Sequence, residues 1–258
     1  MREIGNNYPP KKFVVAGVQR SGTTLITTSL DSHPEIFCAG EMFKMRPPRT
    51  GVDVLDSGYR HHVNSSLRLK LADQFARGRL VPAFLDRFYE RSGFAAVGFK
   101  LMRNQTYRNR FPMVTTYILE RQISVLHVIR ENVLKVYLSR LLANRRRVFH
   151  ATEKLTNLPR LTVPVHDLVA KLENIESEGR ELRETFQSSV PYISVAYESY
   201  AADMEGEGQR LLSFLGVFRA PLRSPLVKLT PEALSEVIDN LDEVRQCLQG
   251  TAYEKWAG

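Results

Sequence analysis

The sequence predicts an α/β protein in which a parallel sheet carries helices on both faces. Short apolar runs rich in β-branched and aromatic residues alternate with longer segments that have helical spacing. Two strands joined through a helix lie parallel in one sheet. The strand pattern occurs four times, at Lys11–Val18, Ala95–Leu101, Ile123–Arg130 and Tyr192–Glu198.

The first strand, KKFVVAGV, ends at a glycine, and the helix TTLITTSLDSHP behind it is stopped by Pro34. Residues 44–66 contain two prolines, two glycines and two adjacent histidines, so we expect a long irregular loop. Helical spacing returns in SLRLKLADQF and in PAFLDRFYERSG, where Gly93 is expected to cap the second helix.

The alternation continues along the rest of the chain. Helices are expected at PMVTTYILE, from Asn132 to about Val148, and over VHDLVAKLENIESEGRELRETF, which is amphipathic. The segment GEGQRLLSFLG follows the fourth strand as a helix capped by Gly216. We expect a last helix over TPEALSEVIDNLDEVRQCL, opened by Thr230 with Pro231 in its first turn.

Length and composition suit one soluble domain over residues 1–258, with 1–11 as a flexible N-terminal segment. No apolar run approaches the roughly 18 residues of a membrane span, and the N-terminus lacks the apolar centre of a secretion signal. Cys38 and Cys247 are too few for a disulfide framework. We therefore expect a cytoplasmic protein.

The chain is basic, with 36 Lys and Arg against 28 Asp and Glu, a net charge of +8. This excess attracts anions, but charge alone leaves open whether the partner is nucleic acid, membrane phosphate, a charged cofactor or solvent only. A nucleic-acid binder is the weaker interpretation, because the basic residues are dispersed and no aromatic-rich binding module follows.

The stretch after the first strand is similar to a phosphate-binding loop without its lysine. Gly17 and Gly22 have the spacing of G-x-x-x-x-G-K-[ST], but Thr23 stands in the lysine position. Backbone N–H groups at a helix start attract anions, and arginine and hydroxyl side chains add donors. The binding residues expected here are Gln19, Arg20, Ser21, Gly22, Thr23 and Thr24.

Other candidate residues follow the other strands, where ligands of α/β sheets bind. Arg130 ends the third strand, and Ser139 lies on the next helix, so the two could hold one phosphate. Lys100, at the end of the second strand, could place an ammonium group in the cleft. Glu41 would be a general base if it faced that cleft. Each of them could instead be a solvated surface side chain.

Three histidines are further candidates. His33 competes with Glu41 for the role of base, although its place before Pro34 at a helix end favours a structural role. His61 and His62 lie in the expected loop and could contact an acceptor, although simple exposure to solvent is the favoured interpretation.

The motifs together resemble those of bacterial sulfotransferases, in the class of the trehalose and Nod-factor sulfotransferases. QRSGTT, the GE at Gly40–Glu41, GFKLMRNQ and VIRENVLKVYLSR occur in the same order. The likeness continues through the YE at Tyr197–Glu198, LLSFLG and NLDEVRQCLQGTAYEKW, so that it spans about residues 13 to 256. The lysine-bearing segment points to this narrower class.

The resemblance implies the parallel α/β fold of sulfotransferases, which is similar to that of P-loop nucleotide kinases. It also implies a sulfuryl donor, 3′-phosphoadenosine-5′-phosphosulfate (PAPS), with adenosine 3′,5′-bisphosphate (PAP) as product. The loop would hold the 5′-phosphosulfate, with Arg20 where many sulfotransferases have lysine. Arg130 and Ser139 match the positions that grip the 3′-phosphate. The C-terminal segment would close over the nucleotide through Gly250, Thr251 and Tyr253.

The resemblance also implies a mechanism. Glu41 matches the glutamate proposed as general base, while Arg20 and Lys100 would neutralise the transferring sulfuryl group and the leaving oxygen without a metal ion. The acceptor would be a hydroxyl on a sugar or glycolipid, with no nucleic acid or transmembrane segment involved and a homodimer left open. The alternative is a P-loop kinase-like phosphotransferase that uses a nucleoside triphosphate, although the lysine and a clear Mg²⁺-binding aspartate are missing.

Overall fold

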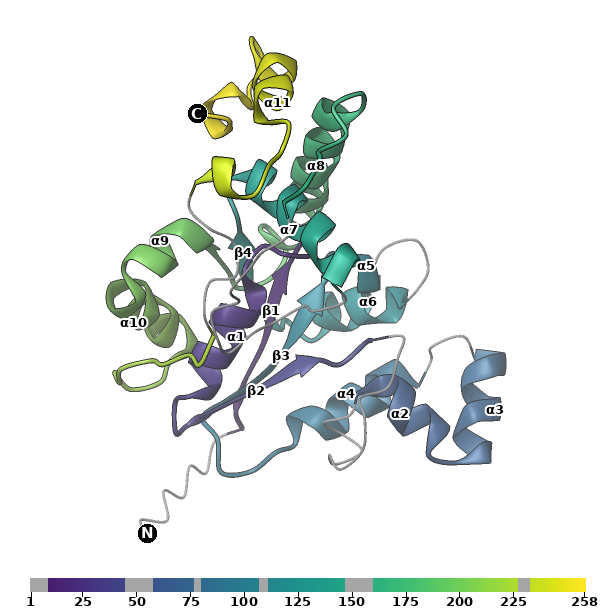
Figure 1. The fold of residues 1–258 in the computed structure, drawn as a ribbon. Coiled ribbons are helices and arrows are strands. Elements are labelled where there is room, and N and C mark those ends of the chain that lie inside the picture. Colours follow the sequence, from purple (N-terminus) through teal and green to yellow (C-terminus); the bar gives the residue numbers. More distant parts are fainter. Residues whose placement is uncertain (1–8, 45–57, 77–79, 107–110, 147–159, 227–232) are drawn as a thin grey trace.

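The computed structural model describes residues 9–44, 58–76, 80–106, 111–146, 160–226 and 233–258. Its centre is a five-stranded parallel sheet in the order β2-β3-β1-β4-β5 (Figure 1). The expected parallel α/β architecture is therefore confirmed. The strands are β1 (Lys11–Gly17), β2 (Ile36–Glu41), β3 (Ala96–Met102), β4 (Ser124–Ile129) and β5 (Tyr192–Ala196).

Helices cover both faces of the sheet (Figure 1). One face packs against α1 (Thr23–Asp31), α9 (Tyr197–Ala202) and α10 (Met204–Leu215). The other packs against α4 (Val81–Tyr89), α6 (Pro112–Glu120), α7 (Val133–Arg146) and α8 (Leu168–Phe186). Because both faces are covered, the strands are almost continuously apolar, and every residue of β3 is buried.

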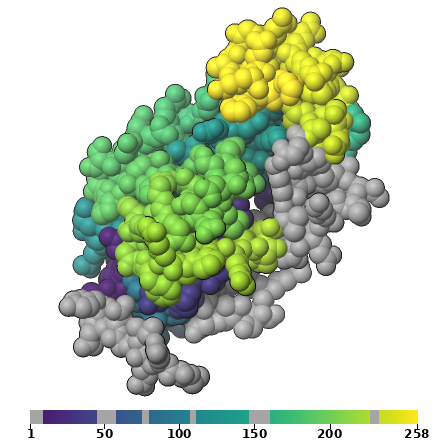
Figure 2. Space-filling model, turned by 90° about the vertical axis from the view of Figure 1, so that its left-hand side faces the viewer, coloured from purple at the N-terminus to yellow at the C-terminus, as the bar shows by residue number. Residues whose placement is uncertain are grey.

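The remaining elements are short. They are α2 (Tyr59–Asn64), α3 (Leu67–Ala76), α5 (Arg103–Thr106), α11 (Leu241–Leu248) and two 3₁₀ turns, η1 (Leu234–Glu236) and η2 (Glu254–Trp256). Viewed from the side of α9 and α10, these two helices form the middle of the surface, and the segment from α11 onward lies above them (Figure 2). The C-terminal segment thus lies at the end of the molecule toward which β1 runs (Figure 1).

The fifth strand, β2, was not among the strands expected from the sequence. It is the short run IFCAGE that begins soon after Pro34, and it pairs with β3 at the edge of the sheet. Its burial is incomplete, because Phe37 and Glu41 are half-buried and Gly40 is exposed. The last residue of this strand is Glu41, the candidate general base.

The expectation of an irregular loop over 44–66 is wrong in part. Residues 58–66 are described, and Tyr59–Asn64 within them form α2. Burial explains this helix, because Tyr59 and Val63 lie on one side of it and are both buried. Residues 45–57 fall outside the described part of the chain, as do residues 1–8 of the expected flexible segment, whose end at Lys11 already belongs to β1.

The single C-terminal helix expected from Thr230 is also wrong. Residues 233–248 form η1, then an extended stretch, then α11. The extended stretch pairs with the chain before α8: Leu161 N–H donates to Val237 O at 2.7 Å, and Asp239 N–H donates to Leu161 O at 2.9 Å. The Asn240 side chain completes this pairing by bonding both the N–H and the C=O of Val163. These tertiary hydrogen bonds replace those of a helix.

Two boundaries also differ from expectation. α4 ends at Tyr89, four residues before Gly93, so Gly93 is a turn residue and not the cap of the helix. Tyr197 and Glu198, expected at the end of the fourth strand, begin α9 instead. In contrast, Gly216 does cap α10 in the left-handed conformation, as expected.

Candidate active site

The loop between β1 and α1 is shaped by two glycines. Gly22 has φ +94°, and a Cβ there would lie 2.1 Å from Cδ2 of Tyr197, so the loop can approach α9 only without a side chain. A Cβ on Gly17 would lie 2.6 Å from Cγ2 of Thr23 and 2.7 Å from Oγ of Ser21. The glycine spacing seen in the sequence therefore lets the loop fold back over the end of β1.

Ser21 is the feature of this loop that fits an anion. Its side chain is completely buried, and its hydroxyl has no hydrogen-bond partner among the residues the structure describes. A buried hydroxyl without a partner is costly, and a phosphate oxygen would supply one. The loop leads directly into the nine-residue helix α1, whose first N–H groups favour negative charge.

Arg20 joins Arg130 and Ser139 beside this loop. Arg20 Nε donates to Oγ of Ser139 at 2.9 Å, and Arg130 Nη1 donates to the backbone oxygen of Arg20 at 3.2 Å. Burial lowers the pKa of Arg20, and the positive charge of Arg130 lowers it further. Two guanidinium groups held together in this way are suited to a multiply charged anion, and the binding of such an anion stays a prediction.

Tyr197 and Glu198 support this cluster, a role that the sequence did not reveal. The Arg130 guanidinium lies 4.7 Å from the centre of the Tyr197 ring, and Arg130 Nε lies 4.0 Å from Oε1 of Glu198. The Glu198 carboxylate also accepts the backbone N–H groups of Glu131 and Asn132. Their position directly after β5 was the available signal, since side chains that follow parallel strands converge at one edge.

An irregularity in β2 decides where Glu41 points. Ala39 pairs with Phe99 of β3, but the next paired residue is Glu41, opposite Lys100. Gly40 is therefore an extra residue, a bulge, and regular pairing would have placed Gly40 opposite Lys100. A bulge re-aims the side chains beyond it. As a result, Glu41 and Lys100 are register partners whose side chains meet.

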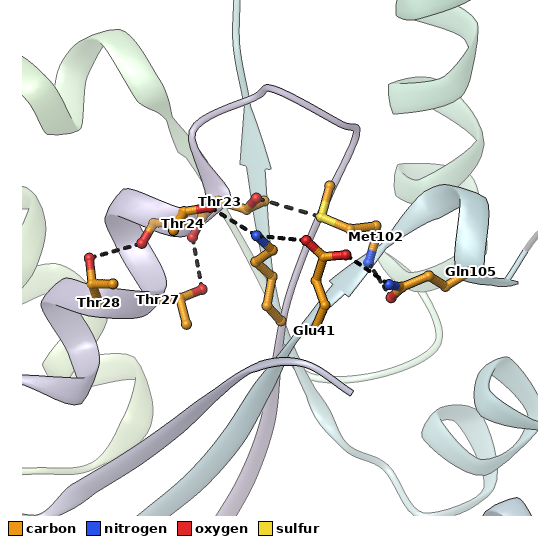
Figure 3. A network of polar contacts seen from close by, with 8 residues as sticks. Thr23, Thr24, Thr27, Thr28, Glu41, Met102 and Gln105 are labelled. Atoms are coloured by element: carbon orange, nitrogen blue, oxygen red, sulfur yellow. Dashed lines mark hydrogen bonds and ion pairs between the residues drawn. The ribbon is translucent and has the colours of Figure 1, made fainter. Parts of the chain in front are cut away.

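Lys100 connects Glu41 to the loop. Its Nζ lies 3.0 Å from Oε1 of Glu41 and donates to Oγ1 of Thr24 at 2.8 Å (Figure 3). The residue is 5% exposed, so its ammonium group does not extend to bulk solvent. Burial lowers the pKa of Lys100, while the neighbouring Glu41 carboxylate acts in the opposite direction. Lys100 thus contacts both Glu41 and the loop. The place of these two side chains in a substrate cleft stays a prediction.

Gln105 is a further residue of this network that sequence reasoning did not single out. Its Nε2 donates to Oε2 of Glu41 at 3.1 Å, and its Oε1 accepts the backbone N–H of Met102 at 3.0 Å (Figure 3). Met102 Sδ in turn accepts a hydrogen bond from Thr23 Oγ1 at 3.6 Å. Gln105 is the last residue of the segment GFKLMRNQ, and no spacing rule links it to Glu41.

The C-terminal residues expected to cover a nucleotide form hydrogen bonds with α8 and with their own segment. Tyr253 is buried, and its hydroxyl donates to Oε2 of Glu176 on α8 at 2.8 Å. Gly250 has φ +73° and donates its N–H to Glu254, while the Thr251 hydroxyl bonds the carbonyl of Leu248. Their contact with a nucleotide stays a prediction.

A cavity of about 330 Å³ lies next to the arginine cluster, and Glu176, which bonds Tyr253 of the C-terminal segment, is in its wall. It lies between β4 and α8, and Val18 and Arg130 line its side toward the loop. Glu176, the partner of Tyr253, lines it from α8, as do Arg180 and Arg183. The C-terminal segment is therefore connected through Glu176 to the wall of a space that adjoins the arginine cluster.

The histidines divide into structural and peripheral residues. Both ring nitrogens of His33 bond the backbone, Nε2 to Phe218 O at 3.1 Å and Nδ1 to the N–H of Glu35 at 3.1 Å, so His33 holds a turn and is not free to act as base. His61 and His62 lie on α2 and are half-buried, in contrast to the exposure favoured from the sequence. His62 packs on Phe84, with ring centroids 5.3 Å apart.

Within the described ranges, no group of three or more His, Cys, Asp and Glu side chains gathers as a metal site would require. The absence of a metal from the reaction stays a prediction. None of the helices in the described part of the chain combines the length and hydropathy needed to cross a bilayer.

Comparison with known proteins addresses the family. A sulfotransferase from Alicyclobacillus acidocaldarius superposes with a TM-score of 0.51 at 15% identity, over 93% of this chain and 91% of that one, and so shares the fold. A mouse sulfotransferase complexed with PAP gives a TM-score of 0.44 at 11% identity, over 95% of this chain and 73% of that one. The sulfotransferase domain of the Synechococcus olefin synthase gives 0.41 at 15% identity, over 100% and 90%.

Among curated protein sequences, none matches this chain. The sequence profile described as the sulfotransferase family, however, matches residues 11–220. This match contains the loop, Glu41, Lys100, Gln105 and the arginine cluster, which are the parts of the site built above. Because it extends over most of the chain, the protein belongs to the sulfotransferase family.

Proposed function

We propose that the enzyme transfers the sulfuryl group of PAPS to a hydroxyl of a sugar or glycolipid, with Glu41 as general base. One observation carries this proposal: the Lys100 ammonium touches both the Glu41 carboxylate, at 3.0 Å, and the Thr24 hydroxyl of the loop, at 2.8 Å. A group that abstracts a proton and a loop suited to phosphate are thereby joined through one cation. Sulfuryl transfer needs this combination.

The donor would lie along the loop from Lys100 to the arginine cluster. The loop N–H groups, Ser21 and Thr24 would hold the 5′-phosphosulfate, and Arg130 with Ser139 would hold the 3′-phosphate. The contact between Arg20 and Ser139 supports a second role for Arg20, that of bridging the two phosphate regions. Gly250, Thr251 and Tyr253 would close the site from the C-terminal side.

In the reaction, the acceptor oxygen bonds to sulfur in line with the departing phosphate oxygen, which keeps the electron pair of the broken S–O bond. The hydroxyl proton moves to a Glu41 oxygen. Lys100 and Arg20 supply positive charge where negative charge builds on the sulfuryl and leaving oxygens. Positioning and electrostatics provide most of the barrier reduction in transfers of this kind.

The choice of a carbohydrate acceptor is supported by the resemblance to the trehalose and Nod-factor class. Residues 45–57, part of the segment expected to shape the acceptor pocket, lie outside the described residues. A single domain, a cytoplasmic location and a reaction without metal belong to the same proposal.

Isothermal calorimetry with PAP, compared with ATP and Mg²⁺, separates the PAPS enzyme from a kinase-like phosphotransferase: only PAP is expected to bind.

The variant Glu41→Gln tests the proposed base. Loss of a general base costs about two to four orders of magnitude, so we expect turnover to fall by at least ~100-fold. PAP affinity should stay within about twofold, because Glu41 holds no donor phosphate here. Turnover is measured with radiolabelled PAPS on a sugar panel that starts with trehalose.

Glu207→Gln is the matched control for this test. Glu207 lies on α10 and pairs with Arg210 at 2.6 Å, away from the loop, so its replacement should leave turnover unchanged. Full turnover in Glu41→Gln would remove Glu41 from the role of base. A loss of PAP affinity as large as the loss of turnover would instead make Glu41 a donor-binding residue.

A further inference from the structure

Glu41 is held through both of its carboxylate oxygens. Lys100 Nζ lies 3.0 Å from Oε1, and Gln105 Nε2 donates to Oε2 at 3.1 Å. Lys100 and Gln105 have different roles in the proposed reaction. The Lys100 cation is needed at the leaving oxygen when charge develops there, and Oε1 must be open to accept the hydroxyl proton. Gln105 has no such second task, because both ends of its amide are already engaged.

The orientation of the Gln105 amide is set by the backbone. Its Oε1 accepts the N–H of Met102, the last residue of β3, at 3.0 Å. An N–H group can donate only to the amide oxygen, so the nitrogen is forced to face Glu41. The side chain is 6% exposed, which excludes most solvent competition. Gln105 can therefore offer Glu41 a donor but not an acceptor.

The short helix α5 makes this contact possible. It begins at Arg103, immediately after β3, and returns the chain so that Gln105 lies beside the strand end it has just left. Met102 also accepts the hydroxyl of Thr23 through its sulfur. A closed ring of contacts results, which runs from Thr24 through Lys100, Glu41, Gln105 and Met102 back to Thr23 (Figure 3). The Glu41 carboxylate is thus connected to the loop in two ways, through Lys100 and through Gln105 with Met102.

We propose that Gln105 is the positioning residue that keeps the Glu41 carboxylate in place while Lys100 turns from Oε1 toward the leaving oxygen. This inference rests on the proposed role of Glu41 as base. As Lys100 moves away, Oε1 becomes free and takes the proton of the acceptor hydroxyl. Oε2 stays bound to the Gln105 amide, so the carboxylate does not rotate out of line with the acceptor.

The variant Gln105→Met tests this role, because it keeps the length of the side chain and removes the donor. A misplaced reacting group costs up to about 100-fold, so we expect kcat to fall by about 10- to 100-fold. PAP affinity should stay within about twofold, since Gln105 contacts no donor-binding group directly. Thermal unfolding is followed in parallel, because the Met102 N–H loses its acceptor.

The decisive measurement is the double variant with Glu41→Gln. A residue that acts through Glu41 has nothing left to position in that background, so Gln105→Met should cause no further loss of kcat. An equal loss in both backgrounds, an unchanged kcat in the single variant or a matching loss of PAP affinity would overturn the role. Full turnover of Glu41→Gln alone would instead refute the proposed base, so the two failures are distinguishable.

The variant Gln105→Glu adds a signature that a structural role would not produce. It keeps an acceptor for the Met102 N–H but places a second carboxyl against Glu41. Two adjacent carboxyl groups share a proton at low pH and repel each other once both are ionised. We expect kcat of the variant, relative to the parent, to rise as pH falls; a ratio independent of pH would overturn the role.

The matched control is Gln209→Met on α10. Gln209 is a half-buried glutamine whose Nε2 also donates to one oxygen, the carbonyl of Ala220, at 3.1 Å. The Gln209→Met variant also loses a hydrogen bond donated by a glutamine amide, but on the opposite face of the sheet from Gln105. Its kcat should equal that of the parent at every pH, and an equal loss in this control would overturn the assignment to Gln105.

Discussion

Arg20 and Arg130 illustrate how single residues prepare the donor site. The loop holds Arg20 at φ +71°, an uncommon conformation for a residue other than glycine, and this turns its side chain to Ser139. Arg130 donates to the Arg20 carbonyl, and its charge lowers the pKa of Arg20. An anion bound beside the two guanidinium groups would offset their mutual repulsion.

Arg130→Ala should therefore weaken PAP binding selectively. Hydrogen bonds to charged groups contribute about 1.5–3 kcal/mol, which corresponds to a loss of roughly 10- to 150-fold in affinity. AMP, which lacks the 3′-phosphate, should bind the variant and the parent about equally. Calorimetry with both nucleotides measures the difference.

Arg210→Ala, which removes an arginine paired with Glu207 on the surface of α10, is the control for charge alone. It should leave the affinities for PAP and AMP unchanged. If Arg130→Ala bound PAP as tightly as the parent, or lost AMP and PAP to the same degree, the assignment of Arg130 to the 3′-phosphate would be wrong.

Single residues of the site differ in how far the sequence alone could predict them. The positions of the loop and of Arg130 were predictable because each directly follows a strand. Their contact with a donor, like that of Ser139, stays a prediction. Gln105 was not, because its meaning depends on which way α5 turns after β3, and a four-residue helix has no periodicity to reveal that.

At the scale of elements, the close packing of β1 on β3 depends on Gly98. Gly98 lies beside Phe13 in the register of these strands, and a Cβ on Gly98 would lie 2.5 Å from the Phe13 ring. Phe13 is completely buried and cannot withdraw without moving other core side chains. The glycine thus creates the space that the ring fills, at the centre of the sheet that carries the site.

Gly98→Ala should lower the free energy of unfolding by about 1–3 kcal/mol, the usual cost of overpacking a core. Gly179→Ala is a control of opposite sign. Gly179 lies inside α8, where a Cβ would meet nothing within 4 Å, so the change should stabilise by about 0.5–1 kcal/mol through helix propensity. Urea unfolding of both variants measures the two effects; a stabilised Gly98→Ala would contradict this account of the packing.

Helices were predictable where apolar residues recur at helical spacing along the sequence. α8 and α10 appear as expected because one apolar face runs along each helix. β2 and the C-terminal turn were not recovered. In β2, Gly40 interrupts the apolar run after only four residues. The C-terminal turn is set by pairing with residues 161–163, which lie far away in the sequence.

At the scale of the whole molecule, His127 couples the stability of the sheet to pH. It lies in β4 under α8, is 2% exposed, and bonds the Tyr192 hydroxyl through Nδ1 at 2.7 Å. Burial lowers the pKa of His127 to about 4, and the positive charge of Arg183 contributes to the shift. The folded protein therefore keeps this ring neutral under conditions where an unfolded chain would protonate it.

Stability should consequently fall as pH decreases from about 6.5 to about 4, because only the unfolded state binds a proton in that window. The shift corresponds to at most about 3 kcal/mol. Denaturant unfolding at pH 7 and pH 5 measures it. His127→Gln should flatten this dependence even if it lowers stability overall, whereas His166→Gln, at an exposed site before α8, should leave it unchanged. An undiminished pH dependence in His127→Gln would assign it to other groups.

By itself, the sequence determined the alternation of strands and helices, the glycine loop after β1 and the basic residues that follow later strands, because each depends on neighbours within a few positions. Only the tertiary structure decided which side chains meet. The bulge at Gly40 places Glu41 opposite Lys100, and the turn of α5 brings Gln105 to the same carboxylate. Register and chain reversal are settled by packing between distant segments, and a shift of one residue would turn Glu41 to the other face of the sheet.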